Sequence, residues 1–104
     1  MCGIAGIFHL ETAKPVDPVR LNKMTDSMGH RGPDGSGAWT APGVGLGHRR
    51  LSIVDLEGGA QPMATKDEAQ IITFNGMIYN FREIRVELEA LGHVFATSAD
   101  TEVI

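Results

Sequence analysis

A segment with the composition of a strand begins at the second residue of this chain, and it constrains the fold more than any other feature. Residues 2–10, CGIAGIFHL, mix β-branched, aromatic and small side chains without a helical period. We expect a buried strand that ties the N-terminus into a sheet and holds Cys2 in place. Because Cys2 is the single cysteine, it cannot form an internal disulfide, and its thiol is either a small buried hydrophobe or a reactive group.

Two segments have the spacing of amphipathic helices. The first is predicted to begin after an N-cap at Asp17, with Pro18 at the first helical position, and to end near Gly29. The second is predicted to begin after a cap at Asn80 and to end at Gly92. In both segments apolar residues recur at spacings of three and four residues. They are Leu21, Met24 and Met28 in the first segment, and Phe81, Ile84, Leu88 and Leu91 in the second.

Strands and loops alternate around these helices. Strands are predicted for residues 38–41, 44–54, 70–75 and 93–98, and turn-rich loops for residues 30–37 and 55–63. The last residues, 99–104, have the pattern of a cap followed by the first turn of a helix. With 104 residues, the chain is one domain or part of one.

The composition is that of a soluble globular protein, with 42% hydrophobic residues, 21% charged residues and a formal net charge of -4. Because there is no basic excess, we expect no nucleic-acid partner. No apolar run is long enough to span a bilayer, and no basic residue precedes the short apolar stretch at the N-terminus, so we expect no membrane partner and no secretion signal. The expected location is the cytoplasm.

Cys2 would carry two reactive groups after removal of Met1. The initiator methionine is normally removed when the next side chain is small, as that of cysteine is. In general a free α-amino group has a pKa of about 7.7 to 8.0 and an ordinary thiol a pKa of about 8.5, so the amine can act as the general base for the thiol. Taken alone, a cysteine at this position is more often an accident of the sequence.

Six sequence blocks follow one another along nearly the whole chain: MCGIAGIF at the N-terminus, RGPDG (31–35), GHRRLSIVDL (47–56), GGAQPM (58–63), NGMIYN (75–80) and SADTEVI (98–104). Together these blocks resemble class II glutamine amidotransferases. HRGPDG and GGAQPM resemble the asparagine synthetase branch more than the branches that make glucosamine phosphate or phosphoribosylamine. Six blocks in family order are not expected by chance.

The resemblance implies an α+β fold of the N-terminal nucleophile hydrolase type, an αββα sandwich with two stacked antiparallel sheets. In the family the domain continues well past the last matched block, so residues 1–104 are expected to be the front half of a type 2 glutamine amidotransferase domain. The synthetase domain, for which the family implies ATP and magnesium, is expected to be absent from this chain, and no cofactor is expected within it. The implied partners are glutamine and the synthetase domain of a longer chain, and a homo-oligomer is left open.

The resemblance also implies the catalytic residues. Cys2 is the implied nucleophile. The side-chain amide of Asn75 and the backbone N–H of Gly76 form the implied oxyanion hole, since hydrolysis of an amide needs donors for the tetrahedral intermediate. Judged from the local sequence alone, Asn-Gly between two apolar segments is more typical of a type I′ hairpin. Both interpretations stay open because a turn can aim the donors.

Glutamine presents an α-carboxylate and an α-ammonium, which require a guanidinium and a carboxylate in the site. The resemblance implies that Arg50 corresponds to the arginine that holds the α-carboxylate in the family. It implies that Asp100 corresponds to the aspartate that receives the α-ammonium. Their local alternatives are an exposed strand residue and a helix N-cap. In a strand, Arg49 would point to the opposite face from Arg50. The resemblance places further backbone beside the substrate, at Leu51, Ile53 and Val54.

Position 77 departs from the family pattern. Glutamate usually follows Asn-Gly, but this chain has Met77, which removes a carboxylate expected to share the substrate ammonium with Asp100. A thioether cannot accept a charge-assisted hydrogen bond of similar strength. The departure puts glutamine binding in question.

Other chemistry has little support in the sequence. The four histidines are scattered without ligand spacing, and one cysteine forms no zinc pattern, so no metal site is expected. No glycine motif that could cradle a nucleotide phosphate is present. The RGPDG block is expected to shape a loop near the site rather than to perform chemistry.

Three hypotheses for the function follow. The leading one is an enzyme domain that releases ammonia from glutamine through a glutamyl thioester on Cys2, for an asparagine-synthetase-like reaction. The alternative is a non-catalytic or structural fragment of the same fold, with glutamine binding impaired by Met77 and truncation. The third is hydrolysis of a different amide, in a substrate without a free amine.

Overall fold

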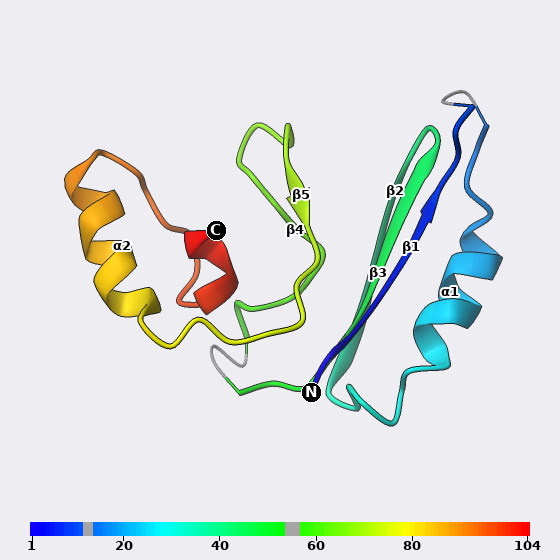
Figure 1. Cartoon of the computed structure of the whole chain (residues 1–104), viewed down its shortest axis with the longest axis horizontal. Coiled ribbons are helices and arrows are strands. Elements are labelled where there is room, and N and C mark those ends of the chain that lie inside the picture. The colour runs from blue at the N-terminus through cyan, green and yellow to red at the C-terminus, as the bar shows by residue number, and fades with distance from the viewer. Residues whose placement is uncertain (12–13, 54–56) are drawn as a thin grey trace.

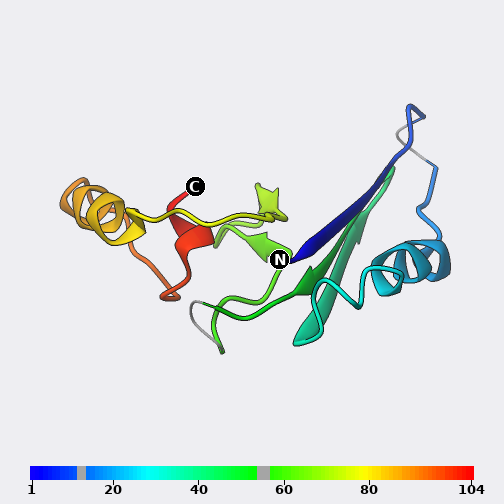
Figure 2. The same ribbon diagram turned by 60° about the horizontal axis from the view of Figure 1, so that its bottom comes forward.

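The computed structural model describes residues 1–11, 14–53 and 57–104, which combine helices and strands, consistent with the expected α+β class (Figure 1). The elements are β1 (Gly3–Phe8), α1 (Pro18–Asp26), β2 (Gly35–Ala41), β3 (Val44–Arg50), β4 (Met63–Ala64), β5 (Ile71–Ile72), α2 (Phe81–Ala90) and the 3-10 helix η1 (Asp100–Val103). Helix α1 lies on one side of the sheet formed by β1, β2 and β3, and the elements from β4 to η1 lie on the other (Figure 2). The αββα sandwich itself stays a prediction.

The three-stranded sheet is antiparallel throughout, with β3 in the middle. Gly3 of β1 lies opposite Arg49, and Gly35 of β2 lies opposite Arg50. Because β2 begins at Gly35, the predicted loop at residues 30–37 is shorter than expected. The turn between β2 and β3 contains Gly43 with φ 80, a backbone conformation that favours glycine.

Helix α1 packs on one face of this sheet, where glycines let it approach closely. Leu21 is 0% exposed and Thr25 is 2% exposed. A Cβ added at Gly45 would lie 2.9 Å from Cγ1 of Val16, and one added at Gly47 would overlap the hydroxyl of Thr25. Strand β3 therefore lacks side chains where the helix lies against it, and this contact buries Leu21 and Thr25 almost completely.

The opposite face of β1 is open, which corrects the prediction of a buried strand. A strand does form at the N-terminus as predicted, but Ile4 is 48% exposed and Phe8 is 72% exposed. Alternate residues of a strand point to opposite faces, and α1 covers only one of them. Elsewhere on this open face the chain returns at Gln61, whose carbonyl oxygen occupies the place that a Cβ at Gly37 would take.

Two predicted strands are short or absent in the second half of the chain. Residues 70–75 were predicted to be a strand, but only Ile71–Ile72 forms one, because its partner β4 offers two residues. The prediction of a strand at residues 93–98 is wrong. There the Glu102 carboxylate accepts hydrogen bonds from the backbone N–H groups of Ala96 and Thr97, each at 2.7 Å. A side chain thus takes the place of a neighbouring strand.

The two helices form close to their predicted positions. Asp17 caps α1 by accepting a hydrogen bond from the backbone at 2.9 Å, and the helix ends at Asp26, slightly earlier than expected. Gly92 follows α2 with φ 96, as predicted for a C-terminal stop. Asn80 occupies the N-cap position of α2 as predicted, but its side chain makes no capping hydrogen bond within the described residues. In the ranges that the structure describes, no helix has the length and apolar character to cross a membrane.

Replacing Gly47 with alanine is expected to destabilise the fold, because the new Cβ would overlap the Thr25 hydroxyl beneath α1. Overpacking of this kind costs about 1 to 3 kcal/mol, which urea unfolding of the full-length protein would measure. Adding Thr25→Ala to Gly47→Ala should recover part of the loss. The matched control is Gly6→Ala, whose Cβ would lie 3.6 Å from its nearest neighbour and should cost nothing. Equal stability of Gly47→Ala and Gly6→Ala would contradict the close packing of α1.

Candidate active site

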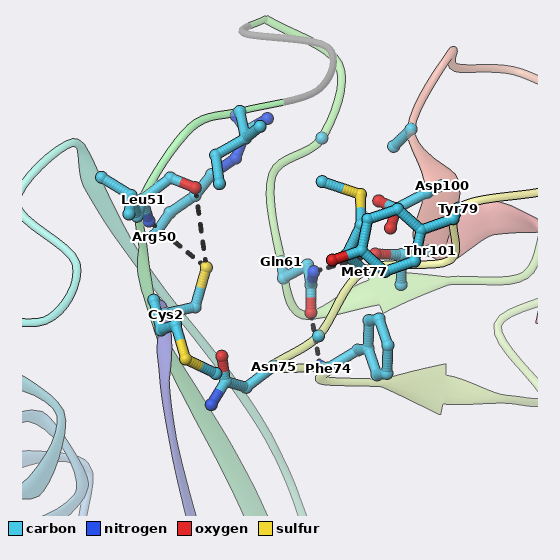
Figure 3. Close-up of a pocket in the computed structure, with 15 residues that line it drawn as sticks. Cys2, Arg50, Leu51, Gln61, Phe74, Asn75, Met77, Tyr79, Asp100 and Thr101 are labelled. Carbon is cyan, nitrogen blue, oxygen red and sulfur yellow. Dashed lines mark hydrogen bonds between the residues drawn. The ribbon is translucent and has the colours of Figure 1, made fainter. Parts of the chain in front are cut away.

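A cavity of about 320 Å³ lies where the beginning of β1 and the end of β3 face the second half of the chain (Figure 3). Its volume falls in the range of small-molecule sites. The lining comes from four parts of the sequence: residues 1–2, residues 50–53 together with 59–61, residues 74–79, and residues 99–101. The cavity therefore exists only when the two halves of the chain are brought together.

The register of the sheet holds Cys2 at the cavity wall. Because Gly3 pairs with Arg49, the preceding residue reaches the end of β3. The backbone N–H of Leu51 donates to Sγ of Cys2 at 3.3 Å, and Sγ lies 3.7 Å from the carbonyl oxygen of Leu51 (Figure 3). Met1 also lines the cavity, so its removal would leave the α-amino group of Cys2 at the cavity wall.

The RGPDG loop fastens Cys2 and the end of β3 together. Nε of Arg31 donates to the carbonyl oxygen of Cys2 at 3.1 Å. Oδ2 of Asp34 accepts a hydrogen bond from the N–H of Ser52 at 2.8 Å. Gly32 permits this approach, since a Cβ there would overlap the backbone of β3. The loop shapes the site through bonds to the backbone, as its turn-rich sequence predicts.

Arg49 and Arg50 belong to opposite faces of β3, as the strand period predicts. Nε of Arg49 donates to the carbonyl oxygen of Gly32 at 2.9 Å, and its NH1 lies 3.6 Å from Oδ1 of Asp26 in α1. Arg50 lines the cavity instead. Of these two arginines, only Arg50 is among the residues that line the cavity.

Asn75 and Gly76 line the cavity in a segment without regular secondary structure. The local prediction of a type I′ hairpin is wrong, because such a turn requires a positive φ at both residues and neither of these described residues has one. In Figure 3 Asn75 lies between Cys2 and Phe74. The pair thus lines the same cavity as Cys2 without forming a hairpin.

The backbone of Phe74, directly before Asn75, is held from both sides. Its N–H donates to Oε1 of Gln61 at 2.6 Å, and its carbonyl oxygen lies 3.2 Å from Nε2 of His48. His48 is 1% exposed, and burial lowers its pKa by more than the hydrogen bond to the Phe74 carbonyl raises it. A neutral His48 with its proton on Nε2 can donate to this carbonyl.

Asp100 and Met77 line the cavity on the side away from Cys2 (Figure 3). Asp100 is 8% exposed, and its Oδ2 accepts a hydrogen bond from the N–H of Ile78 at 2.9 Å. The local alternative of an N-cap is wrong, because Ala99 occupies the cap position of η1. Since Met77 lies in the same cavity, the residue type at position 77 bears on what the site can bind.

The structure brings almost all the predicted site residues into one cavity, although their roles stay predictions. Those that line it are Cys2, Arg50, Leu51, Ile53, Asn75, Gly76, Met77 and Asp100. Val54 lies outside the described residues. Cavity residues without a predicted role are Met1, Gly59, Gln61, Phe74, Tyr79, Ala99 and Thr101. The GGAQPM block was the available signal for Gln61. No cluster of three or more His, Cys, Asp or Glu that could hold a metal occurs in the described part of the chain.

Comparison with known proteins relates the whole chain to one family. A family model described as a glutamine amidotransferase domain matches residues 1–104. The chain is 48% identical over 106 residues to glutamine-hydrolyzing asparagine synthetase 1 of Bacillus subtilis (strain 168), and 40% identical over 108 residues to glutamine-hydrolyzing asparagine synthetase B of Escherichia coli (strain K12). These alignments cover 100% of this chain but 17% and 19% of the two relatives, so the chain spans less than a fifth of their length.

Lowering the pH is expected to destabilise the protein through His48. Its pKa in the folded protein lies below the ordinary value of 6.5, so the unfolded state binds the proton more readily. Stability contributed by neutral His48 is present above about pH 6.5 and falls as the pH drops toward the lowered pKa. Thermal unfolding across this range measures the loss.

The His48→Gln variant should show a weaker pH dependence than the wild-type protein, since glutamine does not titrate. His93→Gln is the matched control, because His93 is exposed. A His48→Gln profile parallel to that of the wild type would show that His48 is not the group responsible.

Proposed function

This chain belongs to the glutamine amidotransferase domain family, and from that premise we propose that it hydrolyses glutamine to supply ammonia for asparagine synthesis by a longer protein. The observation that carries the proposal is one cavity lined by Cys2, Arg50, Asn75 and Asp100. These residues offer a nucleophile, a guanidinium, an amide donor and a carboxylate. Each reacting or charged group of glutamine then has a partner of suitable chemistry.

Cys2 is the proposed nucleophile once Met1 has been removed. Its free α-amino group accepts the thiol proton, and Sγ attacks the side-chain carbonyl carbon of glutamine. Two hydrogen bonds support a fixed position for this residue, from Leu51 N–H to Sγ at 3.3 Å and from Arg31 to the Cys2 carbonyl at 3.1 Å. Such fixing of a nucleophile lowers the entropic part of the barrier.

Asn75 and Gly76 are the proposed donors to the oxyanion that forms when Sγ attacks. Donors of this kind act best when their positions are set before the substrate binds. Support comes from the residues on either side of the pair. The N–H groups of Phe74 and Ile78 are already bonded at 2.6 and 2.9 Å.

The proposed tetrahedral intermediate collapses to a glutamyl thioester on Cys2 when its C–N bond breaks. The proton taken up by the α-amine passes to the departing nitrogen, which leaves as ammonia. Water then attacks the thioester carbonyl carbon and gives up a proton through the same amine. The C–S bond breaks, glutamate is released and the thiol is restored, so glutamine and water become glutamate and ammonia.

Arg50 and Asp100 are proposed to select glutamine by its charged end. The guanidinium of Arg50 would receive the α-carboxylate, and the carboxylate of Asp100 the α-ammonium. Leu51 and Ile53 line the cavity next to Arg50 and would contact the substrate, together with Val54, which lies outside the described residues. Met77 leaves Asp100 without the second carboxylate that the family pattern has.

The remainder of the fold and the acceptor reaction are proposed to lie outside these residues. The open face of the three-stranded sheet, with Ile4 48% and Phe8 72% exposed, suits burial beneath the second sheet of an N-terminal nucleophile hydrolase sandwich. Relatives of which this chain covers 17 to 19% carry the name asparagine synthetase. The use of ammonia, with its ATP and magnesium, is therefore assigned to a separate synthetase domain.

The Cys2→Ala variant of the full-length protein is expected to lose all glutaminase activity, because no thioester can form. Cys2→Ser should retain at most a small remainder, since a hydroxyl ionises far less readily than a thiol. The rate of glutamate release from glutamine measures the activity of both variants, and unchanged turnover in Cys2→Ala would contradict the mechanism. As a further control, an N-terminal tag that retains Met1 converts the α-amine into an amide and should also abolish turnover.

Replacing Met77 with glutamate is expected to tighten glutamine binding, because the substrate ammonium gains a charged acceptor. Charge-assisted hydrogen bonds contribute roughly 1.5 to 3 kcal/mol, or about ten- to a hundredfold in affinity. Calorimetric titration of glutamine in the Cys2→Ala background, where turnover does not consume the ligand, measures the gain, and Met77→Gln in that background is the neutral control.

The gain should be confined to ligands with a free α-amine. An analogue of glutamine without that group should bind the wild-type and glutamate variants alike. If the wild-type protein already binds glutamine as tightly as the Met77→Glu variant, then Asp100 alone suffices and Met77 is not a lost ligand contact.

A further inference from the structure

The side chain of Gln61 connects two cavity segments that lie far apart in the sequence (Figure 3). Its Oε1 accepts a hydrogen bond from the N–H of Phe74 at 2.6 Å, and its Nε2 donates to Oγ1 of Thr101 at 3.1 Å. Phe74 precedes Asn75, and Thr101 follows Asp100. One amide therefore joins the segment with the oxyanion donors to the segment with the ammonium acceptor.

The segment from Phe74 to Ile78 is held at both of its ends. At one end, Phe74 bonds to Gln61 through its N–H and lies 3.2 Å from Nε2 of the buried His48 through its carbonyl oxygen. At the other end, the N–H of Ile78 donates to Oδ2 of Asp100 at 2.9 Å. Because Gln61 also binds Thr101, these contacts form one connected set around Asn75, Gly76 and Met77.

The position of Gln61 is itself fixed by the three-stranded sheet. Its carbonyl oxygen occupies the place of a Cβ at Gly37, a residue of β2. Close packing of this kind leaves little freedom to the backbone at that point. The side-chain amide is thereby anchored to the same sheet that carries Cys2 at the start of β1.

We propose that Gln61 is a positioning residue that sets the distance between the Cys2 sulfur and the donors of Asn75 and Gly76. The inference rests on the proposed function. Gln61 need not touch the substrate, since it acts through the peptide of Phe74. An amide suits this role because both its acceptor and its donor are used, whereas an apolar side chain of the same length offers neither.

The test is Gln61→Met in the full-length protein, with glutamine hydrolysis as the first readout. A displacement of the oxyanion donors by about 1 Å is enough to lower turnover by around a hundredfold, so kcat should fall about ten- to a hundredfold. The KM for glutamine should change much less than kcat, because Arg50 and Asp100 remain. Gln70→Met is the matched control, since Gln70 is exposed and outside the cavity, and it should leave kcat unchanged.

A double-mutant cycle with Asn75→Ala separates positioning from a general loss of structure. If Gln61 acts through the donors, Gln61→Met should reduce kcat much less when Asn75 has already been removed. A purely structural defect would lower kcat by the same factor in both backgrounds. Thr101→Val breaks only the second hydrogen bond and should cause a smaller loss than Gln61→Met, whereas Thr101→Ser keeps the acceptor and should retain activity.

Amide hydrogen exchange provides a readout that does not depend on glutaminase activity. In Gln61→Met the N–H of Phe74 loses its acceptor and should exchange at least tenfold faster than in Gln70→Met. If the wild-type protein does not hydrolyse glutamine, the proposed function is refuted. Faster exchange at Phe74 in Gln61→Met would still confirm the Gln61 contact in that case. Unchanged kcat in an active protein, equal factors in the double-mutant cycle, or unchanged exchange at Phe74 would each overturn the role of Gln61.

Discussion

The antiparallel pairing of β1 with β3 is the constraint on which the rest of the site depends. With Gly3 opposite Arg49, the residue before β1 lies beside Leu51, and the thiol of Cys2 meets the backbone there at 3.3 Å. Because side chains alternate along a strand, a slip of one residue would turn Arg50 away from the cavity. Helix α1 opposes such a slip, since it can approach the sheet only where glycines such as Gly47 lie beneath it.

The second half of the chain is held by bonds from side chains to the backbone rather than by a sheet. Its two-stranded sheet has two residues in each strand, and α2 has no buried residue within the described part of the chain. Glu102 bonds the N–H groups of residues 96 and 97, Asp100 bonds that of Ile78, and Gln61 bonds that of Phe74. Each of these bonds satisfies a backbone N–H that lies outside the helices and strands, so together they favour this irregular conformation.

Residue chemistry and strand period predicted part of the site without the structure. The resemblance to the family implied Cys2 as the nucleophile, and alternation along β3 separated Arg50 from Arg49. Local patterns failed at Asn75 and at Asp100, which resemble a hairpin turn and a helix cap but form neither. Gln61 escaped prediction because its hydrogen-bond partners lie 13 and 40 residues away, and nothing in a short turn-rich segment indicates contacts over such separations.

The sequence by itself determined the features that depend on near neighbours: the strand at the N-terminus, the cap of α1 at Asp17, the end of α2 at Gly92, and the family blocks that relate the chain to glutamine amidotransferases. The tertiary structure alone decided that residues 93–98 are not a strand and that four distant stretches share one cavity. The physical reason is that a backbone N–H bonds to whichever acceptor the folded chain brings to it. At Phe74 and Ile78 those acceptors are the side chains of Gln61 and Asp100, which local sequence patterns do not identify.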